Sequence, residues 1–291
     1  MKCLDRSIHT RARHELYTFF CFILFFFSTY ISAEAQIVDD YLEGEKFLYA
    51  ETKQVNQFLR RFNAEESEEG VKLLPDDKQY HNQSLRKQFL PLIFDNFTSD
   101  YPDDLKKKFV KDVLDNREPQ YLNFRSDGWF AEVTASVSYK GKEENVVLFL
   151  KVEEENLGYK WVFEKVYFEP FVEVFDIDTT LSSVFLHPMS HEIDFMNLQR
   201  AFQNKEEIEE YTYKYYQPDF LSLFLFEIKQ SNLQFKNVKD VKFHFFQIDD
   251  WYFEISEFNR SGYNKGWLIS NLVKVPEDQK DILRNYIYFG K

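Results

Sequence analysis

The hydrophobic and polar positions of this 291-residue chain first follow a helical period and then a period of two. Apolar side chains recur three, four and seven residues apart from about position 39 to position 114, which predicts amphipathic helices. From Trp129 onwards apolar and polar residues alternate, which is typical of half-buried antiparallel strands. The first half is therefore predicted to hold helices at 39–62, at 84–97 and from Pro102 onwards, then strands at 129–139, 146–153 and 159–166, with a short extra strand at 121–124.

The second half repeats this order of elements. Helical spacing starts near Ser190, and the apolar run after Asp219 is so continuous that its helix is expected to be buried. Each half carries one Trp that opens a strand and another in its last strand, so the pattern predicts a duplicated α+β unit. The second copy comprises helices at 190–203, 206–216 and 220–228, strands at about 238–248, 251–258 and 265–275, and a short helix at 277–288.

The closing strands of the two halves read Lys160-Trp161-Val162-Phe163 and Gly266-Trp267-Leu268-Ile269. Helices followed by an antiparallel meander with such a closing strand resemble the NTF2-like (cystatin-like) superfamily, in which a curved sheet wraps the helices around a cavity. The resemblance implies two lobes, at 37–170 and 187–276, with a linker at 171–186 and a C-terminal helix or tail at 277–291. Because this fold hosts dehydratases, isomerases and binding modules, the resemblance does not select a function.

The first 35 residues have the pattern of a secretory signal. Four basic residues precede a mostly apolar run at 16–31, and Ala33-Glu34-Ala35 supplies the small-x-small pattern for cleavage after Ala35. An uncleaved N-terminal anchor is the alternative interpretation. Both cysteines, Cys3 and Cys21, lie in this segment. We therefore expect an exported bacterial protein, periplasmic or secreted, with no membrane span after cleavage and no disulfide.

Charge and composition narrow the classes of partner. The net charge of −13 disfavours nucleic-acid binding, because phosphate backbones repel an acidic surface. With 44% hydrophobic residues, 19% aromatic residues and only 8 Gly, the chain is expected to be globular and to lack a glycine-rich phosphate loop. No cofactor is expected, and a protein or glycan partner is compatible with the charge.

The string Phe175-Asp176-Ile177-Asp178-Thr179-Thr180-Leu181 resembles the first motif of haloacid-dehalogenase-type phosphatases, in which a strand ends in Asp-x-Asp-Gly-Thr. The resemblance would make Asp176 the nucleophile and Asp178 the proton donor of a metal-dependent phosphatase. Thr179 replaces the glycine of that motif, and the strand–helix alternation of a parallel sheet does not follow. An acidic linker is therefore favoured, and Asp249-Asp250 is interpreted as a hairpin turn and not as a metal pair.

Three histidines are candidate site residues. His187 and His191 have the spacing of a zinc pair, but Pro188 and a cap at Ser190 would keep them off one helix face. His244 lies on a predicted strand, and a neighbouring Glu254 would complete an acid/base pair of the dehydratase type. By contrast, alternation places Glu132, Glu153 and Glu164 at solvated positions.

The tyrosine cluster at 211–216 has too many rings for one buried helix face, so part of it is expected to form a partner surface. The favoured function is a non-catalytic, exported protein that binds a partner protein or glycan in the bacterial envelope. The alternatives are a small-ligand-binding or dehydratase/isomerase-like cavity in the second lobe, and the phosphatase at Asp176. A homodimer through an open sheet face is also compatible with the fold. The candidate partner-binding residues are Tyr211, Tyr213, Tyr215 and Tyr216.

Overall fold

The computed structural model divides the chain into two units, at 1–54 and 55–291, and the elements below all belong to the second unit. The predicted signal, its cleavage site after Ala35 and the first part of the helix predicted at 39–62 lie outside the described residues. None of the described helices combines the length and the apolar composition that a membrane span requires. The structure describes residues 54–98, 101–115, 117–156, 158–175, 185–203, 205, 208–213, 215–261 and 264–289.

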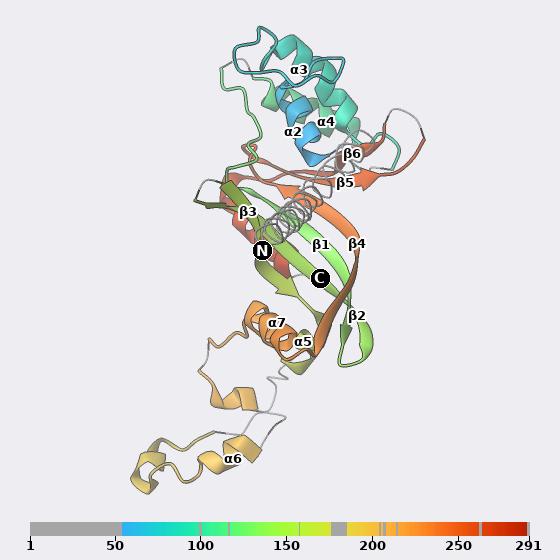
Figure 1. The fold of residues 1–291 in the computed structure, drawn as a ribbon. Helices are drawn as coiled ribbons and strands as arrows, with labels where there is room; N and C mark the ends of the chain where they lie inside the picture. The colour runs from blue at the N-terminus through green and yellow to red at the C-terminus, as the bar shows by residue number, and fades with distance from the viewer. Residues whose placement is uncertain are drawn as a thin grey trace, which may run out of the picture. The chain divides into compact units, whose positions relative to one another are not determined.

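Six strands form one open antiparallel sheet, so the protein is α+β as predicted (Figure 1). Its order is β3-β2-β1-β4-β5-β6, and every neighbouring pair is antiparallel. The period of two placed β1 correctly and the other strands to within a few residues. The strands are β1 (Trp129–Tyr139), β2 (Lys142–Glu155), β3 (Gly158–Tyr167), β4 (Leu233–Phe245), β5 (Trp251–Phe258) and β6 (Gly266–Lys274).

The two halves of the chain meet in the middle of this sheet. β1 pairs with β4 from Trp129 opposite Phe245 to Tyr139 opposite Leu233, with two register shifts between. The strands of both predicted lobes therefore share one sheet, and the two-lobe NTF2-like architecture is not confirmed. The short strand predicted at 121–124 is wrong, because the Asn63 side chain takes both backbone hydrogen-bonding groups of Leu122, at 2.8 and 2.9 Å.

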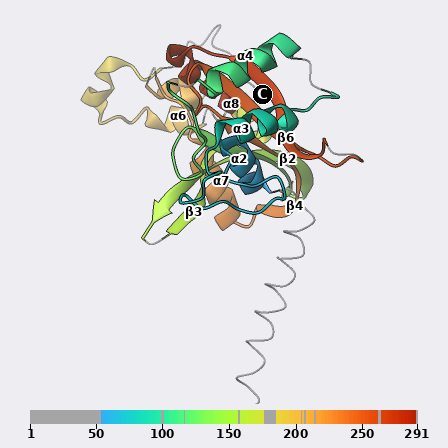
Figure 2. The ribbon, with the colours of Figure 1, turned by 90° about the horizontal axis from the view of Figure 1, so that it is seen from above.

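Helices of the first half cover strands of the second half. Phe58, Phe62 and Phe109 surround the ring of Phe253 on β5, with centroid distances of 6.2, 6.1 and 5.7 Å. The indole Nε1 of Trp251 donates to Asp112. Figure 2 shows the helices of this layer together. They are α2 (Val55–Asn63), α3 (Gln83–Phe89), the 3₁₀ turn η1 (Leu90–Ile93) and α4 (Asp103–Val113), and the last begins directly after the predicted Pro102 boundary.

Conversely, a helix of the second half covers strands of the first half. Phe224 of α7 (Phe220–Lys229) packs with Val137, Leu148 and Val166, next to α5 (Glu169–Val174). Asp219 caps α7 as predicted, but the expected burial of this helix is wrong. Phe224 is its only buried residue, and Phe226 is 55% exposed, because the sheet contacts one side of the helix.

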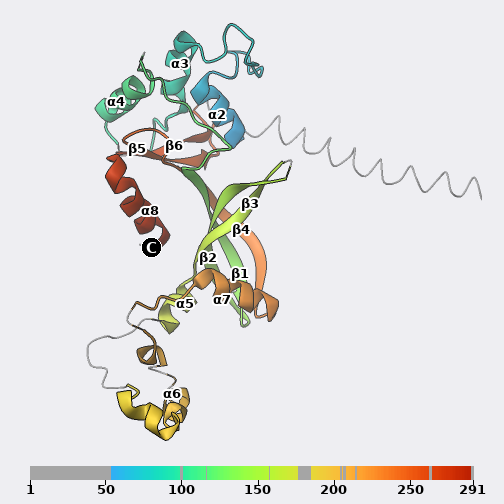
Figure 3. The same ribbon diagram turned by 90° about the vertical axis from the view of Figure 1, so that its left-hand side faces the viewer.

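The C-terminal helix covers the opposite face of the sheet (Figure 3). After the 3₁₀ turn η4 (Glu277–Gln279), α8 (Lys280–Phe289) packs Ile287 and Tyr288 against Phe130 and Tyr252. Residues of β1 alternate between the two layers, since Trp129 faces the α2–α4 core and Phe130 faces α8. The predicted helix at 277–288 is therefore confirmed.

The helices predicted at 190–203 and 206–216 are wrong as continuous elements. Asp194 and Phe195 both have left-handed backbone angles, with φ of 50° and 53°, so a right-handed helix cannot run through them. Three short elements replace the two helices: η2 (Pro188–Ile193), α6 (Leu198–Gln203) and η3 (Ile208–Tyr211).

A buried ion pair ties the end of η1 to the loop before β6, and it predicts a pH-dependent stability. Asp95 accepts hydrogen bonds from Arg260, at 2.7 Å, and from Phe97 and Thr98. Burial alone would raise the pKa of Asp95, but these bonds outweigh it and lower the pKa. A lowered folded-state pKa stabilises the fold above the unfolded value of about 3.9, and this stability is lost as pH falls through the folded-state pKa.

We therefore expect Asp95→Asn to lower the free energy of unfolding by about 1.5–3 kcal/mol at pH 7 and by much less near pH 3. Urea denaturation at the two pH values measures both differences. Asp127→Asn, at an exposed position, is the control and should stay within about 0.5 kcal/mol of the parent. An equal loss at both pH values for Asp95→Asn would contradict the assigned role of the carboxylate.

Candidate functional site

Three buried polar side chains meet on the sheet face that carries α8. His244 of β4 places Nε2 3.0 Å from Oε2 of Glu132 on β1, and Nδ1 2.8 Å from the hydroxyl of Tyr252 on β5. Phe130 stacks on the imidazole at 4.8 Å. Burial raises the pKa of Tyr252, so the phenol keeps its proton. With Tyr252 donating to Nδ1, the ring carries its own proton at Nε2 and donates to Glu132.

This arrangement differs from the pair that the sequence predicted. His244 and Glu254 are opposite each other in the β4–β5 ladder, but the side chain of Glu254 bonds with Ser270 at 3.0 Å and lies 3.5 Å from Lys242. The carboxylate at His244 is that of Glu132, which is 4% exposed and not solvated as alternation suggested. The missed signal is the central place of β1, which has a strand on each side and a helix over this face.

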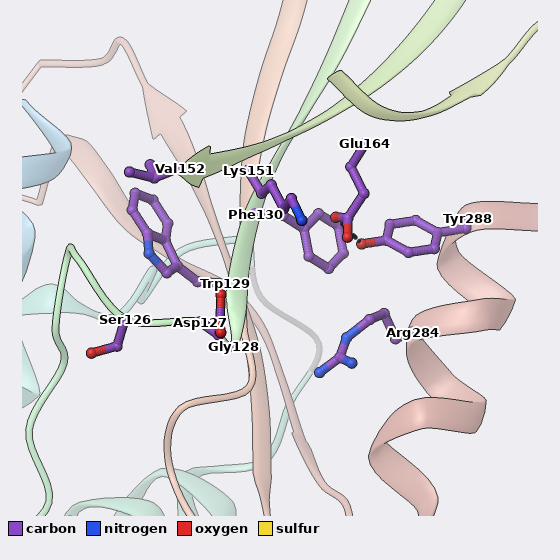
Figure 4. A pocket seen from close by; sticks show the side chains of 10 residues that line it. All are labelled: Ser126, Asp127, Gly128, Trp129, Phe130, Lys151, Val152, Glu164, Arg284 and Tyr288. Atoms are coloured by element: carbon purple, nitrogen blue, oxygen red, sulfur yellow. Dashed lines mark hydrogen bonds between the residues drawn. The ribbon is translucent and has the colours of Figure 1, made fainter. Parts of the chain in front are cut away.

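A cavity of about 350 Å³ is lined by Phe130, the ring that stacks on His244, together with residues of β2, β3 and α8 (Figure 4). Arg284 and Tyr288 of α8 reach it from one side and Lys151 from another. The Tyr288 hydroxyl donates to Glu164 at 2.8 Å, and burial together with this bond raises the pKa of Tyr288. Phe130 lines the cavity and stacks on His244, so its ring separates the two. None of the three residues of the Glu132–His244–Tyr252 cluster lines this cavity.

The described residues include only some of the other catalytic and metal candidates. Asp176 and Asp178 lie outside the described residues, so the phosphatase stays a prediction. His187 and His191 are each used within their own turn: Nδ1 of His187 accepts from the backbone of Met189, and Nδ1 of His191 lies 3.0 Å from the carbonyl of Pro188. Across the described ranges, no group of three His, Cys, Asp or Glu side chains could hold a metal ion. Asp249 and Asp250 form the β4–β5 turn, as predicted.

The stretch between α5 and α7, residues 185–216, exposes most of its large apolar side chains; we call it the aromatic segment. Within its described residues, the side chains classed as buried belong to small residues, Ser190 and Ala201. In this segment small residues are buried and large apolar residues are exposed, which is the reverse of the arrangement in an ordinary hydrophobic core. The exposed large residues are Phe185, Met189, Ile193, Phe195, Met196, Leu198, Phe202, Ile208, Tyr213, Tyr215 and Tyr216.

Local polar bonds explain why the small residues face inward. The Ser190 hydroxyl donates to the carbonyl of His187 at 2.6 Å and accepts from the amide of Asn197 at 2.8 Å. These bonds close the turn on Ser190 and leave the neighbouring apolar side chains outside. Tyr213 is 70% exposed and lies edge-on to Tyr216 at 6.4 Å, whereas Tyr211 is half-buried.

The aromatic segment is also acidic. Its sequence holds six carboxylates against three basic residues. The acidic residues are Glu192, Asp194, Glu206, Glu207, Glu209 and Glu210, and the basic ones are Arg200, Lys205 and Lys214.

Comparisons of the chain with family models, with curated proteins and with solved structures each return no match.

Proposed function

We propose that this protein is a non-catalytic binding protein and that it engages a partner protein through the aromatic segment. The observation that carries the proposal is the exposure of large apolar side chains there, with Met196 at 77% and Phe202 at 78%. Large apolar side chains exposed to water cost free energy, and a segment rich in them is typical of a site that a partner covers. The burial of His244 away from the adjacent cavity supports a role without catalysis.

The chemistry of the segment favours a basic protein surface as the partner. Aliphatic and thioether side chains such as Ile193, Met196 and Leu198 stand beside the aromatic ones, and such side chains fit an apolar protein groove better than a sugar ring. The excess of carboxylates complements Lys and Arg on the partner and repels acidic surfaces. Export to the bacterial envelope, suggested by the signal-like first 35 residues, is part of the same proposal, as is the NTF2-like relationship.

Replacing three exposed residues together tests the surface. We expect Met196→Ser, Phe202→Ser and Tyr213→Ser in one chain to weaken partner binding at least about tenfold. The thermal midpoint should hardly change, because the three side chains are largely in solvent. A matched control is Lys107→Ser, at a side chain on α4 that is 76% exposed.

The partner is identified by a photo-crosslinking amino acid at position 202 of the full chain in producing cells, with position 107 as the comparison. One discrete protein adduct from position 202 that weakens as salt rises supports the proposal. A glycan adduct, or equal adducts from the two positions, contradicts the choice of partner. A large fall in the thermal midpoint of the triple variant would show that these side chains belong to a core.

A further inference from the structure

A cleft of about 530 Å³ lies at the end of α2, away from the aromatic segment in sequence and in its contacts. Its walls come from α2, from the loop at 64–81 and from the stretch just before β1. The backbone N–H of His81 donates to the carbonyl of Ala64 at 3.0 Å and closes the loop. Both residues have left-handed backbone angles, with φ of 56° and 55°. We call this the His81 cleft.

A column of flat side chains forms one wall of the His81 cleft. The imidazole of His81 lies between the rings of Tyr80 and Tyr121, at centroid distances of 4.0 and 4.1 Å and nearly parallel to both. Glu65 holds the column in place, since its Oε1 lies 3.0 Å from Nε2 of His81 and accepts from the Tyr80 hydroxyl at 3.4 Å. The loop thus carries an ordered aromatic surface into an open cleft.

The charges at this cleft are opposite in sign to those of the whole chain. Three cationic side chains, Arg60, Lys72 and Arg125, line it against the single carboxylate of Glu65, although the chain carries a net charge of −13. Arg60 and Arg61 both pair with the carboxylate of Glu66, at 3.3 and 3.0 Å. The local excess of positive charge attracts anions, which the rest of the protein surface repels.

A fourth cation lies behind the aromatic wall. The guanidinium of Arg86 is fully buried and stacks on Tyr121 at 4.3 Å. Its Nε and Nη2 donate to the carbonyls of Phe62 and Gln120, at 3.1 and 2.5 Å, and its Nη1 has no hydrogen-bond partner in the described part of the chain. Burial lowers the pKa of Arg86. None of the described ion pairs gives this buried cation a carboxylate, so an anion in front of Tyr121 would supply a counter-charge.

We infer that the His81 cleft binds a small organic anion that contains a ring. The anionic group is held by Arg125, Lys72 and Arg60, and the ring packs against the Tyr80–His81–Tyr121 column. The volume lies in the range of small-molecule sites. A uronic acid sugar and an aromatic carboxylate share this chemistry, because both join a ring face to a carboxylate.

Calorimetric titration of the full chain tests the inference with two charged probes and their neutral counterparts. The probes are digalacturonate and 4-hydroxyphenylacetate, set against galactobiose and 4-hydroxybenzyl alcohol, with inorganic phosphate as the bare anion. We expect one of the charged probes to bind with a Kd below about 1 mM and its neutral counterpart to bind at least tenfold more weakly. Whichever charged probe binds shows whether the ligand is a uronic acid sugar or an aromatic carboxylate. Raising the salt from 50 to 500 mM should weaken its binding.

Two variants locate the binding in the cleft. Arg125→Gln and His81→Asn should each weaken the bound probe about tenfold, and Asn tolerates the left-handed backbone of position 81. Lys107→Gln, an exposed cation on α4, should leave binding unchanged. Failure of both charged probes to bind, equal binding of the neutral compounds, phosphate binding as tight as either ring compound, or full binding by Arg125→Gln would each overturn the inference. Partner crosslinking at position 202 is unaffected by these variants, which separates the two sites.

Discussion

Replacing Phe253 by alanine is expected to lower the free energy of unfolding by about 3–5 kcal/mol, because the change removes a fully buried ring and leaves a cavity. Phe253 contacts Phe58, Phe62 and Phe109 from the helices of the first half, and it stacks on Phe245 at 4.9 Å. The loss therefore weakens the packing between halves as well as the packing within the sheet. Urea denaturation followed by circular dichroism measures it.

The matched control is Phe235→Ala on β4, where the side chain is 64% exposed and the change should stay within about 0.5 kcal/mol. The two halves should also unfold together, since each contributes the helices that cover the other. Two separated transitions, or a loss below about 1 kcal/mol for Phe253→Ala, would show that the halves are independent.

Glu132→Ala is expected to cost about 3–4 kcal/mol, because it leaves the buried Nε2–H of His244 without an acceptor and opens a cavity in the centre of the sheet. Glu153→Ala on β2 is the control, since the Glu153 side chain is 45% exposed and pairs with Lys151 at the surface. That change should stay within about 0.5 kcal/mol. Chemical denaturation at one pH compares the two directly.

Glu132→Gln separates the hydrogen bond from the volume. A glutamine keeps an oxygen that accepts from Nε2, so this variant should recover at least half of the stability lost in Glu132→Ala. Combining Glu132→Ala with His244→Ala should cost less than the sum of the single changes, because the two residues share one bond. Additive losses would show that the 3.0 Å contact contributes nothing of its own.

The local pattern of apolar and polar residues predicted most of the individual helices and strands. Alternation from Trp129 to Tyr139 gave the bounds of β1, and Pro102 followed by two aspartates marked the start of α4. In both places the local periodicity agrees with the burial that the tertiary structure imposes. The helix expected at 190–203 failed because Asp194 and Phe195 turn left-handed, and helical spacing of apolar residues does not report such a break.

The pairing of elements could not be predicted in the same way. That β1 pairs with β4, and that the helices of each half cover the other half, depends on contacts between residues far apart in the sequence, such as Trp129 with Phe245 and Phe58 with Phe253. The burial of Glu132 could not be predicted from the alternation within β1, because it results from the neighbouring strands on both sides of β1. The His81 cleft was missed as well, because Glu65, His81 and Arg125 share no motif. The loop closure at Ala64 brings His81 to Glu65, and the bonds between Asn63 and Leu122 hold the stretch that carries Arg125.

The exchange of helices between the halves has a consequence for how the chain folds as it leaves the ribosome. Phe58 of α2 packs against Phe245 and Phe253, which lie far towards the C-terminus. The carbonyl of Ile269 on β6 accepts a hydrogen bond from the backbone N–H of Asp95, just after η1. At bacterial or slower rates of synthesis, the stretch from position 58 to position 269 takes roughly 10–40 s to emerge. During that interval the apolar face of α2 has no strands to cover it, so the nascent protein offers chaperones a binding segment until translation is nearly complete.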